Sequence, residues 1–314
     1  MKKQEKSIIT FSRRTDPAFY MDWFIDKINK GGCYVTNPYS GKPYYVSLSQ
    51  NDVLLMNFWT KNPQATLLGT RFLMQRGYSV AYFISQTNYP RWLERGVPLI
   101  EHTLDAVLQL KEMIPRASIW WRYDPIIITR KLNRNWHIDN FSRLCEELWK
   151  DNTERVIISL AHIDGAYKAI RQNLISHCLI QGDELIMPGY DEFINLAQAL
   201  SGIANKHGII LEVCCSPSIS DSDKSRVNQA ACLSIEYLRK IIPELPSLKI
   251  SGTRRGSDKF GYAPCGCVKS RDIGSNGTCL HGCVYCYANR GQNVIKRGWI
   301  HPESPWLSPK KIFF

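Results

Sequence analysis

The sequence of 314 residues has no uninterrupted apolar run long enough to span a membrane. It shows no secretory signal either, because the apolar run after the basic N-terminus is very short and the polar residues Ser12, Arg13 and Arg14 follow it. No internal repeat and no low-complexity tract stands out. These absences argue against a membrane-spanning protein and a repeat array, and they predict a cytoplasmic location with no membrane partner.

The composition is that of an ordinary globular protein, with 44% hydrophobic and 22% charged residues. A chain of this length can form one large α/β domain or two smaller ones. The formal net charge is +12. A charge of this sign is typical of a protein with a polyanionic partner such as nucleic acid, but also of a basic surface that only faces solvent, so both interpretations stay open.

Short runs of β-branched and aromatic residues alternate with amphipathic stretches. The predicted strands cover residues 7–12, 33–37, 54–59, 78–85, 118–123, 155–163, 208–213 and 248–252. The predicted helices cover residues 18–30, 63–76, 98–114, 138–150 and 191–208, and an insertion at 164–189 carries its own helix. This alternation predicts an α/β fold with a parallel sheet covered by helices.

Nearly every predicted strand ends in polar or metal-binding residues, as in SRRTD, WTKNP, RYDP, AHID and CCSP. Functional residues at the carboxyl ends of most strands favour a complete or partial (β/α) barrel of the TIM type over an open sheet. We therefore predict a barrel domain over residues 1–252 and a cysteine-rich, cluster-binding segment over 253–314 that packs on it. The residues that would face the barrel mouth are Arg13, Arg14, Asp16, Lys61, Asn62, Arg122, Asp124, His162 and Asp164.

Arginine and lysine at such a mouth can hold a carboxylate or phosphate, and aspartate can bind ribose hydroxyls. Each residue also has a purely structural interpretation. Arg122 and Asp124 can form an ion pair that caps a loop, and His162 can be a buried imidazole with its hydrogen bonds satisfied. We select Lys61, Arg122, Asp124 and His162 as candidate catalytic residues.

The eleven cysteines are distributed unevenly. Cys33, Cys145 and Cys178 are isolated, which favours small buried side chains over any chemistry. The other eight lie between residues 214 and 286. In a chain with no sign of export, this crowding indicates metal binding rather than disulfides.

Three of these cysteines lie close together in TCLHGCVYCYAN, at positions 279, 283 and 286. Three nearby thiolates can hold one face of a [4Fe–4S] cluster and leave one iron open to a further ligand. Zinc is the alternative, since Cys283 and Cys286 form a C-x-x-C pair that His281 or Cys279 could help complete.

A second group of cysteines can bind an auxiliary [4Fe–4S] cluster. Its predicted ligands are Cys214, Cys232, Cys265 and Cys267. Cys215 is the alternative to Cys214. We prefer Cys214 because it is the cysteine of an L-x-x-C pattern. In the competing interpretation, Cys232 is a core residue and Cys265 and Cys267 join a zinc site.

The C-terminal motif, C-x-x-x-C-x-aromatic-C with Tyr285 as the aromatic residue, resembles the signature of radical S-adenosylmethionine enzymes. The resemblance implies that Cys279, Cys283 and Cys286 bind a [4Fe–4S] cluster whose open iron takes the amino and carboxylate groups of S-adenosylmethionine. It implies reductive cleavage of that cosubstrate to a 5′-deoxyadenosyl radical, and a full or partial (β/α) barrel. Tyr285 would lie near the adenine, and Arg13, Asp16 and Asn62 are further candidates for cofactor binding.

The position of the motif differs from the pattern of that superfamily, in which it usually follows the first strand. A circular permutation explains the difference: the cluster loop would follow the last strand, and residues 7–12 would take the place of the second strand. SRRTD then stands where the superfamily has a glycine-rich motif that binds methionine.

Longer motifs resemble a bacterial family called domain of unknown function 1848. They are GGCYVTNPYSG, NFWTKNP, WRYDPI and CGCVKSRDIGSNGTCLHGCVYCYAN. FWTKNP and RYDP are also similar to motifs of spore photoproduct lyase, a radical S-adenosylmethionine enzyme that acts on DNA.

The sequence therefore predicts a cytoplasmic radical S-adenosylmethionine enzyme whose substrate is unknown, with nucleic acid or a nucleotide as one candidate. A reductant such as flavodoxin or ferredoxin would be its partner. Two other classes stay open, namely a zinc-containing nucleic-acid-binding protein and a non-catalytic iron–sulfur redox protein.

Overall fold

The computed structural model describes residues 6–11, 14–37, 40–161, 163, 167–214, 227–242, 244–252, 265–289, 303–305 and 307. The chain forms two compact units. Unit 1 comprises Met1–Ile84, Arg91–Ile114 and Ser270–Phe314, and unit 2 comprises Ser85–Pro90 and Pro115–Lys269. The C-terminal cysteine motif therefore belongs to the same unit as the N-terminus. The sequence predicts a domain boundary after residue 252. Residues 253–264, which follow that boundary, are outside the described residues.

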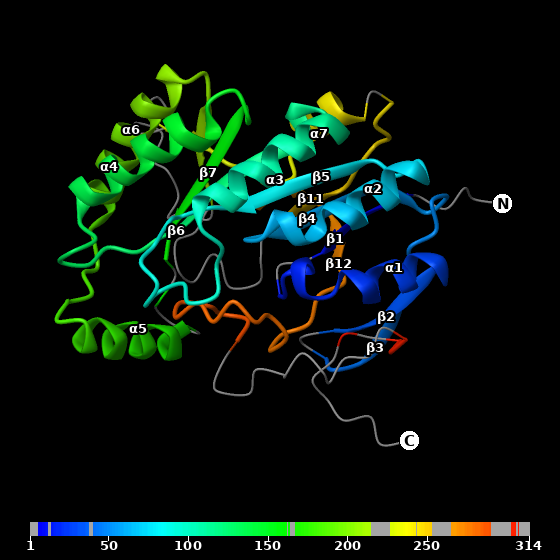
Figure 1. Cartoon of the computed structure of the whole chain (residues 1–314), viewed down its shortest axis with the longest axis horizontal. Coiled ribbons are helices and arrows are strands. Elements are labelled where there is room, and N and C mark those ends of the chain that lie inside the picture. Colours follow the sequence, from blue (N-terminus) through cyan, green and yellow to red (C-terminus); the bar gives the residue numbers. More distant parts are fainter. Residues whose placement is uncertain are drawn as a thin grey trace. The chain divides into compact units, whose positions relative to one another are not determined.

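Unit 1 contains four parallel strands in the order β12 (Ser270–Asp272), β1 (Ser7–Phe11), β4 (Val53–Thr60) and β5 (Val80–Ser85). Ile9 of β1 lies in register with Arg271 of β12 on one side and with Met56 of β4 on the other. Figure 1 shows β12, from the far end of the sequence, beside β1. The strand that leads into the cysteine motif is therefore a neighbour of the first strand of the chain.

Helices follow the strands of unit 1. They are α1 (Met21–Asn29), α2 (Leu67–Gln75) and α3 (Ile100–Met113), with short 3-10 helices at Pro17–Phe19 and Pro63–Thr66 and a hairpin of β2 (Gly32–Thr36) and β3 (Pro43–Ser47). Asp16 caps the 3-10 helix that precedes α1, since its side chain accepts a hydrogen bond from the backbone of Ala18. Gly31 has a φ of 77° just after α1, which explains why the helix ends there.

Aromatic side chains join the sheet of unit 1 to α1. The ring of Phe11 lies 5.3 Å from that of Phe24, which in turn lies 5.5 Å from Phe58. Tyr82 extends this contact from β5, 5.3 Å from Phe58. These residues alternate with others along β1, β4 and β5, so the opposite face of the sheet carries Thr10 and Asn57.

Unit 2 also contains four parallel strands, β6 (Ile119–Ile126), β7 (Arg155–Leu160), β8 (Ile210–Val213) and β9 (Asn228–Gln229), in that order. An antiparallel pair, β10 (Ile250–Gly252) and β11 (Cys265–Val268), completes its strands. Its helices are α4 (Arg134–Leu144), α5 (Lys168–Ile180), α6 (Tyr190–Lys206) and α7 (Ile235–Ile241), with a 3-10 turn at Arg116–Ser118 and a π-helical turn at Cys145–Trp149.

The core of unit 2 forms where α4 covers β6. Trp121 stacks on Phe141 at 4.7 Å and on Trp149 at 5.4 Å. Trp120 and Trp121 are both buried. Cys33, Cys145 and Cys178 are buried too, and burial raises the pKa of their thiols to about 12, 12 and 11. These three cysteines are small core residues, as expected.

The predicted α/β class with parallel strands and covering helices is confirmed. Within the described ranges, the strands of neither unit close into a barrel. Among the helices that the structure describes, none is both long enough and apolar enough to cross a bilayer.

Candidate functional site

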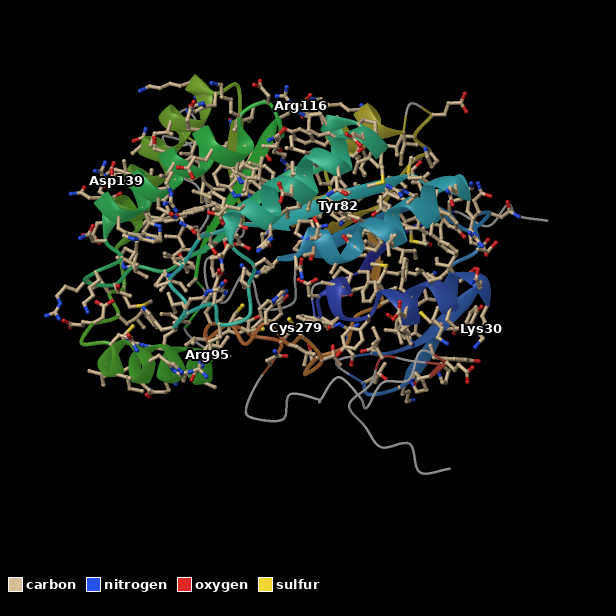
Figure 2. The ribbon with its side chains drawn as sticks, viewed as in Figure 1. Lys30, Tyr82, Arg95, Arg116, Asp139 and Cys279 are labelled. Atoms are coloured by element: carbon tan, nitrogen blue, oxygen red, sulfur yellow. The ribbon has the colours of Figure 1, made fainter. Side chains whose placement is uncertain are left out.

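The cysteine loop, residues 279–286, follows β12 in unit 1 and carries three thiols that are each partly buried. Figure 2 labels Cys279 on this segment. The loop pairs with the stretch before α3: Val284 N donates to Leu93 O at 2.9 Å, and Gly96 N donates to His281 O at 2.8 Å. An antiparallel bridge between Glu94 and Cys283 lies between these bonds. The loop is thus held against residues 93–96 by backbone hydrogen bonds.

The three thiols share one local environment. Burial raises the pKa of all three, that of Cys283 to about 12, and repulsion from Cys286 adds to the effect on both Cys279 and Cys283. The nearby charge of Lys61 acts in the opposite direction on Cys283 and Cys286. Without a metal these thiols are protonated at neutral pH, so a metal that binds them must displace protons.

A buried ion pair anchors the middle of the cysteine loop. His281 Nε2 donates to Asp16 Oδ2 at 2.8 Å, and His281 Nδ1 donates to Gly96 O at 3.0 Å. Burial alone would lower the pKa of His281 and raise that of Asp16. Their mutual attraction reverses both effects, so the pKa of His281 is raised and that of Asp16 is lowered. Asp16 therefore favours the protonated form of His281, and both ring nitrogens have hydrogen-bond partners.

Asp16 ties the loop to two strand ends. Its Oδ1 accepts from Thr60 Oγ1 at 2.7 Å and from Ala18 N at 2.9 Å, while Oδ2 also accepts from Lys61 N at 2.7 Å. Both carboxylate oxygens thus bond within the protein, where β1 and β4 end. Its predicted contact with a cofactor stays a prediction.

Glu94 is a buried carboxylate that the sequence analysis did not single out. It is 2% exposed, accepts a hydrogen bond from Lys61 Nζ at 2.8 Å and accepts another from the Tyr285 hydroxyl. Lys61 Nζ also lies 5.8 Å from the centre of the Tyr285 ring. The structure therefore brings the predicted residues Lys61 and Tyr285 together beside the cysteine loop, because both bond to Glu94. The position of Glu94 in a loop gave no signal in the sequence.

The second thiol group consists of Cys214, Cys232 and Cys267 in unit 2. Cys214 follows β8, Cys232 precedes α7, and Cys267 lies in β11. The sulfurs of Cys214 and Cys232 are 3.3 Å apart. Hydrogen bonds from Cys214 and Cys267, together with the charges of Arg122 and Arg155, hold the pKa of Cys232 well below its usual range.

Three of the four predicted auxiliary ligands thus lie together. The side chain of Cys265, the fourth, and the alternative ligand Cys215 are outside the described residues. Glycine at position 266 lets β11 approach Ala231, the neighbour of Cys232 in the sequence, since an added Cβ would lie 3.3 Å from the Ala231 side chain.

Two buried arginines face Cys232. Arg122 Nη1 donates to Cys232 Sγ at 3.0 Å, and Arg122 Nη2 forms an ion pair with Asp124 Oδ2 at 2.6 Å. Arg155 Nη1 donates to Cys232 O at 2.9 Å and is paired with Glu212. The ion pair that the sequence left open for Arg122 and Asp124 is therefore present, and a catalytic role for them stays a prediction.

The remaining predicted residues are less informative. Arg13, His162 and Asp164 lie outside the described residues. Asn62 is partly exposed and precedes the 3-10 helix Pro63–Thr66, with its backbone N donating to Thr60 Oγ1 at 2.8 Å. Arg14 contacts Asp272 at 3.4 Å, at the end of β12.

Within the part of the chain that the structure describes, no three His, Cys, Asp or Glu side chains converge closely enough to hold a single metal ion. His281 cannot complete a zinc site in this arrangement, because Asp16 and Gly96 occupy both ring nitrogens. A cuboidal cluster makes a different demand, since each thiolate binds its own iron.

Comparison with protein families decides the membership of the chain. A family model described as "Domain of unknown function (DUF1848)" matches residues 8–288. The chain belongs to the DUF1848 family. Both thiol groups of this DUF1848 chain lie within the matched residues.

Other comparisons add little. No curated protein matches the chain. One solved structure concerns inhibition of the pneumococcal virulence factor StrH and N-glycan recognition and hydrolysis; it is 12% identical, with 76% of this chain and 63% of that chain covered and a TM-score of 0.28. The DUF1848 chain thus spans less than two thirds of that structure's length, and a likeness of this size carries no argument about fold or function.

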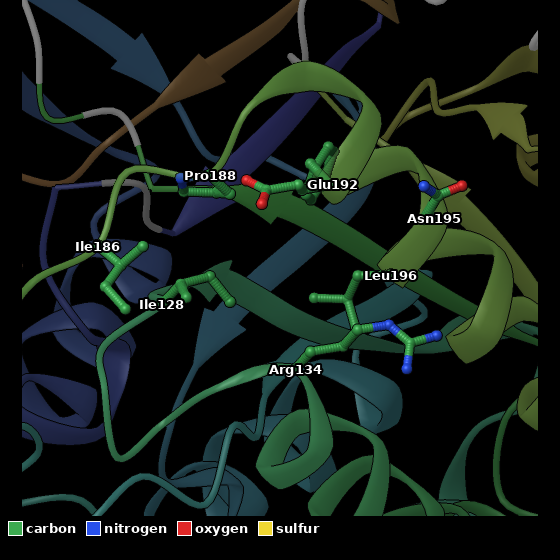
Figure 3. A pocket seen from close by; sticks show the side chains of 8 residues that line it. Ile128, Arg134, Ile186, Pro188, Glu192, Asn195 and Leu196 are labelled. Carbon is green, nitrogen blue, oxygen red and sulfur yellow. The ribbon is translucent and has the colours of Figure 1, made fainter.

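A cavity of about 340 Å³ lies in unit 2. Figure 3 shows Ile128 and Ile186 on one side of it and Asn195 and Leu196, from α6, on the other. The lining of this cavity contains neither a thiol nor any residue predicted for the site. Glu192 is one of its polar residues, and the Oε2 atom of Glu192 already accepts a hydrogen bond from Gly189 N at 2.7 Å.

Among the residues of unit 1 that the structure describes, two buried side chains on neighbouring strands have polar atoms without a hydrogen bond. These are Thr10, through Oγ1, and Asn57, through both amide atoms. They lie in register with each other on β1 and β4 of the DUF1848 chain. Buried polar groups normally have partners, so such a pair marks a place where water or a bound molecule can complete the bonding.

Proposed function

We propose that this DUF1848 chain is a radical S-adenosylmethionine enzyme with a [4Fe–4S] cluster on Cys279, Cys283 and Cys286. The observation that carries the proposal is the cysteine loop itself. Three thiols follow a parallel strand, and the loop between them is fixed by the Asp16–His281 ion pair and by backbone pairing with residues 93–96. A substrate-activating cluster needs such a rigid support.

The order of strands supports a circular permutation. The cysteine loop follows β12, which pairs in parallel with β1, and β1 pairs in parallel with β4. In the superfamily that the motif resembles, the loop follows the first strand and the second strand lies next in the sequence. Here β12 takes the first place and β1 the second. We infer a partial (β/α) barrel on this basis.

The residues of the cysteine loop fit an iron–sulfur cluster better than zinc. The available ligands are three thiols. Their pKa values are raised, and a cationic metal core would lower them again. His281 already bonds to Asp16. When bound, the cluster and S-adenosylmethionine would supply one-electron cleavage of the sulfonium. The protein's own part is to hold the thiols and to place Lys61 and Tyr285 next to them through Glu94.

Asn57 and Thr10 supply further support for a bound molecule in unit 1. An amide offers a donor and an acceptor side by side, and both are unpaired in Asn57. A cosubstrate or substrate with complementary polar groups would satisfy them. Nucleic acid or a nucleotide stays a candidate substrate because of the net charge of +12.

The second thiol group supports an auxiliary [4Fe–4S] cluster on Cys214, Cys232, Cys267 and Cys265. The sulfurs of Cys214 and Cys232 lie 3.3 Å apart, Arg122 contacts the second of them, and cations near thiolates favour the anionic ligands that iron requires. We place the enzyme in the cytoplasm, with flavodoxin or ferredoxin as its reductant.

The test is anaerobic reconstitution with iron and sulfide, followed by incubation with S-adenosylmethionine and dithionite. We expect about eight irons per chain if both groups bind a four-iron cluster, and we expect 5′-deoxyadenosine and methionine as products. The triple variant of Cys279, Cys283 and Cys286 to alanine should lose both products, whereas Cys178→Ala, which removes a buried isolated thiol, should retain them.

Each alternative has its own outcome. Zinc instead of iron in the anaerobically purified protein would favour the nucleic-acid-binding protein. Iron without any cleavage of S-adenosylmethionine would favour the non-catalytic redox protein.

A further inference from the structure

We infer that Arg122 and its partner Asp124 set the reduction potential of the cluster at the second thiol group. The inference rests on the proposed function, because it requires a cluster bound by Cys214, Cys232 and Cys267. The starting observation is a direct contact: Arg122 is 5% exposed, and its Nη1 lies 3.0 Å from the sulfur of Cys232.

The guanidinium group of Arg122 divides its nitrogens between the sulfur and the carboxylate. Asp124 Oδ2 accepts from Nη2 at 2.6 Å and from Nε at 3.3 Å, which leaves Nη1 to donate to Cys232. Asp124 is held in turn by the hydroxyl of Ser159, which donates to Oδ1. The positive group therefore contacts the ligand, and the negative group contacts the arginine.

Arg155 repeats the arrangement on the backbone of the same cysteine. It donates to Cys232 O at 2.9 Å and to Ala231 O at 2.6 Å, and its Nε pairs with Glu212. Cys232 thus lies against two buried guanidinium groups, each with its own carboxylate. Of these two arginines, Arg122 donates to the sulfur and Arg155 to the backbone, so the potential should depend on Arg122 more than on Arg155.

The physical reason is that the ligand sulfurs become more negative when a cluster gains an electron. A buried cation that donates a hydrogen bond to a sulfur stabilises the reduced form more than the oxidised form, and hydrogen bonds and net charge are known determinants of cluster potential. Arg122 should therefore raise the potential. Asp124 should lower it, because the carboxylate offsets part of the charge of Arg122.

Arg122 and Asp124 should affect the reduction potential with opposite signs, and this distinguishes residues that tune the cluster from residues that only support the fold. If Arg122 and Asp124 only held the fold together, removing either residue would weaken or abolish the cluster. If they tune it, a neutral residue at position 122 lowers the potential and a neutral residue at position 124 raises it.

The experiment uses the full chain with Cys279, Cys283 and Cys286 changed to alanine, so that only the second cluster contributes. The protein is reconstituted anaerobically and titrated with dithionite and redox mediators while the paramagnetic signal of the reduced cluster is recorded. Arg122→Met, Arg122→Lys and Asp124→Asn are compared in this background. Arg130→Met is the control, because Arg130 is an exposed arginine of unit 2 that bonds to Gly182 O.

We expect Arg122→Met to lower the ratio of reduced to oxidised cluster about tenfold at a fixed potential, which is 59 mV for one electron. Arg122→Lys should give a smaller decrease, Asp124→Asn an increase and Arg130→Met no change. Equal potentials in Arg122→Met and Arg130→Met, or shifts of the same sign at positions 122 and 124, would overturn the inference.

The outcomes also separate this inference from the proposed function. If the triple-alanine chain binds no iron, the proposed second cluster fails and the inference fails with it. If iron is bound and the potentials do not move, only the inference fails. Should Arg122→Met lose its iron, the sign of the shifts in Arg122→Lys and Asp124→Asn still decides the question.

Discussion

At the scale of single residues, Asp16 is the clearest link between the strands of unit 1 and the cysteine loop. Asp16→Ala would remove the charged partner of His281 and leave its buried Nε2 without a hydrogen bond. Removing one partner of a buried ion pair typically costs about 3–5 kcal/mol. We therefore expect the free energy of unfolding, measured by urea denaturation at pH 7, to fall by about that amount.

The control for this prediction is Asp22→Ala, which removes an exposed carboxylate from α1. Exposed substitutions of this kind change the free energy of unfolding by about 0.5 kcal/mol or less. Similar small effects for Asp16→Ala and Asp22→Ala would contradict a stabilising role for the ion pair.

His137 allows a prediction about pH that is independent of any metal. It is fully buried in unit 2, where Nδ1 lies 2.8 Å from the Tyr123 hydroxyl and Nε2 lies 3.0 Å from Ile127 O. Burial lowers the pKa of His137 from 6.5 to about 4. Between these values the unfolded chain binds a proton that the folded chain does not.

The stability that depends on neutral His137 is therefore complete above pH 6.5 and is lost as the pH falls toward 4. A pKa difference of this size corresponds to about 3 kcal/mol. We expect the free energy of unfolding of the wild-type chain, measured relative to His137→Gln, to decrease by about that amount between pH 7 and pH 4. A difference that stays constant across this range would show that His137 does not titrate as described.

At the scale of elements, the cysteine loop depends on its close contact with the stretch before α3. A Cβ at Gly96 would lie 3.0 Å from His281 O and 3.2 Å from His281 Cα, which are backbone atoms that cannot move without shifting the loop. Gly96→Ala should therefore lower the free energy of unfolding by about 1–3 kcal/mol. It should also lower the iron content toward that of the second thiol group alone, as measured by iron analysis after reconstitution.

Gly202→Ala is the matched control for Gly96→Ala. Gly202 lies in α6 with no atom near the position of an added Cβ. Alanine there should raise the free energy of unfolding by about 0.5–1 kcal/mol and leave the iron content unchanged. Equal iron contents in the two variants would mean that the Gly96 contact does not support the cluster.

The long elements could be predicted from the sequence because their patterns are local. The strands near residues 7–12, 54–59 and 118–123 appear as β1, β4 and β6. The short strands β3, β9, β11 and β12 were missed. The sequences of these strands, such as NQ in β9 and CGCV in β11, carry too little alternation to be recognised, and the partner of β12 is distant in the sequence.

The candidate sites could be predicted only in part. The spacing of Cys279, Cys283 and Cys286 is a local signal, so the cysteine loop was found. Glu94 was not, because its role depends on Lys61 and Tyr285, which are distant in the sequence. The meeting of Arg122 with Cys232 likewise joins residues 110 positions apart, and no local pattern encodes it.

At the scale of the whole molecule, each unit contains one thiol group. Unit 1 combines the C-terminal cysteine loop with residues from the N-terminal strands, and unit 2 combines cysteines from β8 to β11 with an arginine of β6. Both groups therefore form only when their own unit has folded. Pairings across such long separations are slow to form, so we expect metal to enter folded units rather than to nucleate them.

The net charge of +12 leads to a prediction for the whole chain. If the charge serves a polyanionic partner, the chain should bind a short single-stranded DNA oligonucleotide at about 50 mM salt. The logarithm of the affinity should then fall linearly with the logarithm of the salt concentration, with a slope of about −0.7 for each neutralised phosphate, because bound cations are released. Fluorescence anisotropy at several salt concentrations measures this slope.

A peptide nucleic acid of the same base sequence, which has bases but no phosphates, is the control and should bind far more weakly. Equal binding of both oligomers, or an affinity that does not depend on salt, would mean that the positive charge is only a solvated surface.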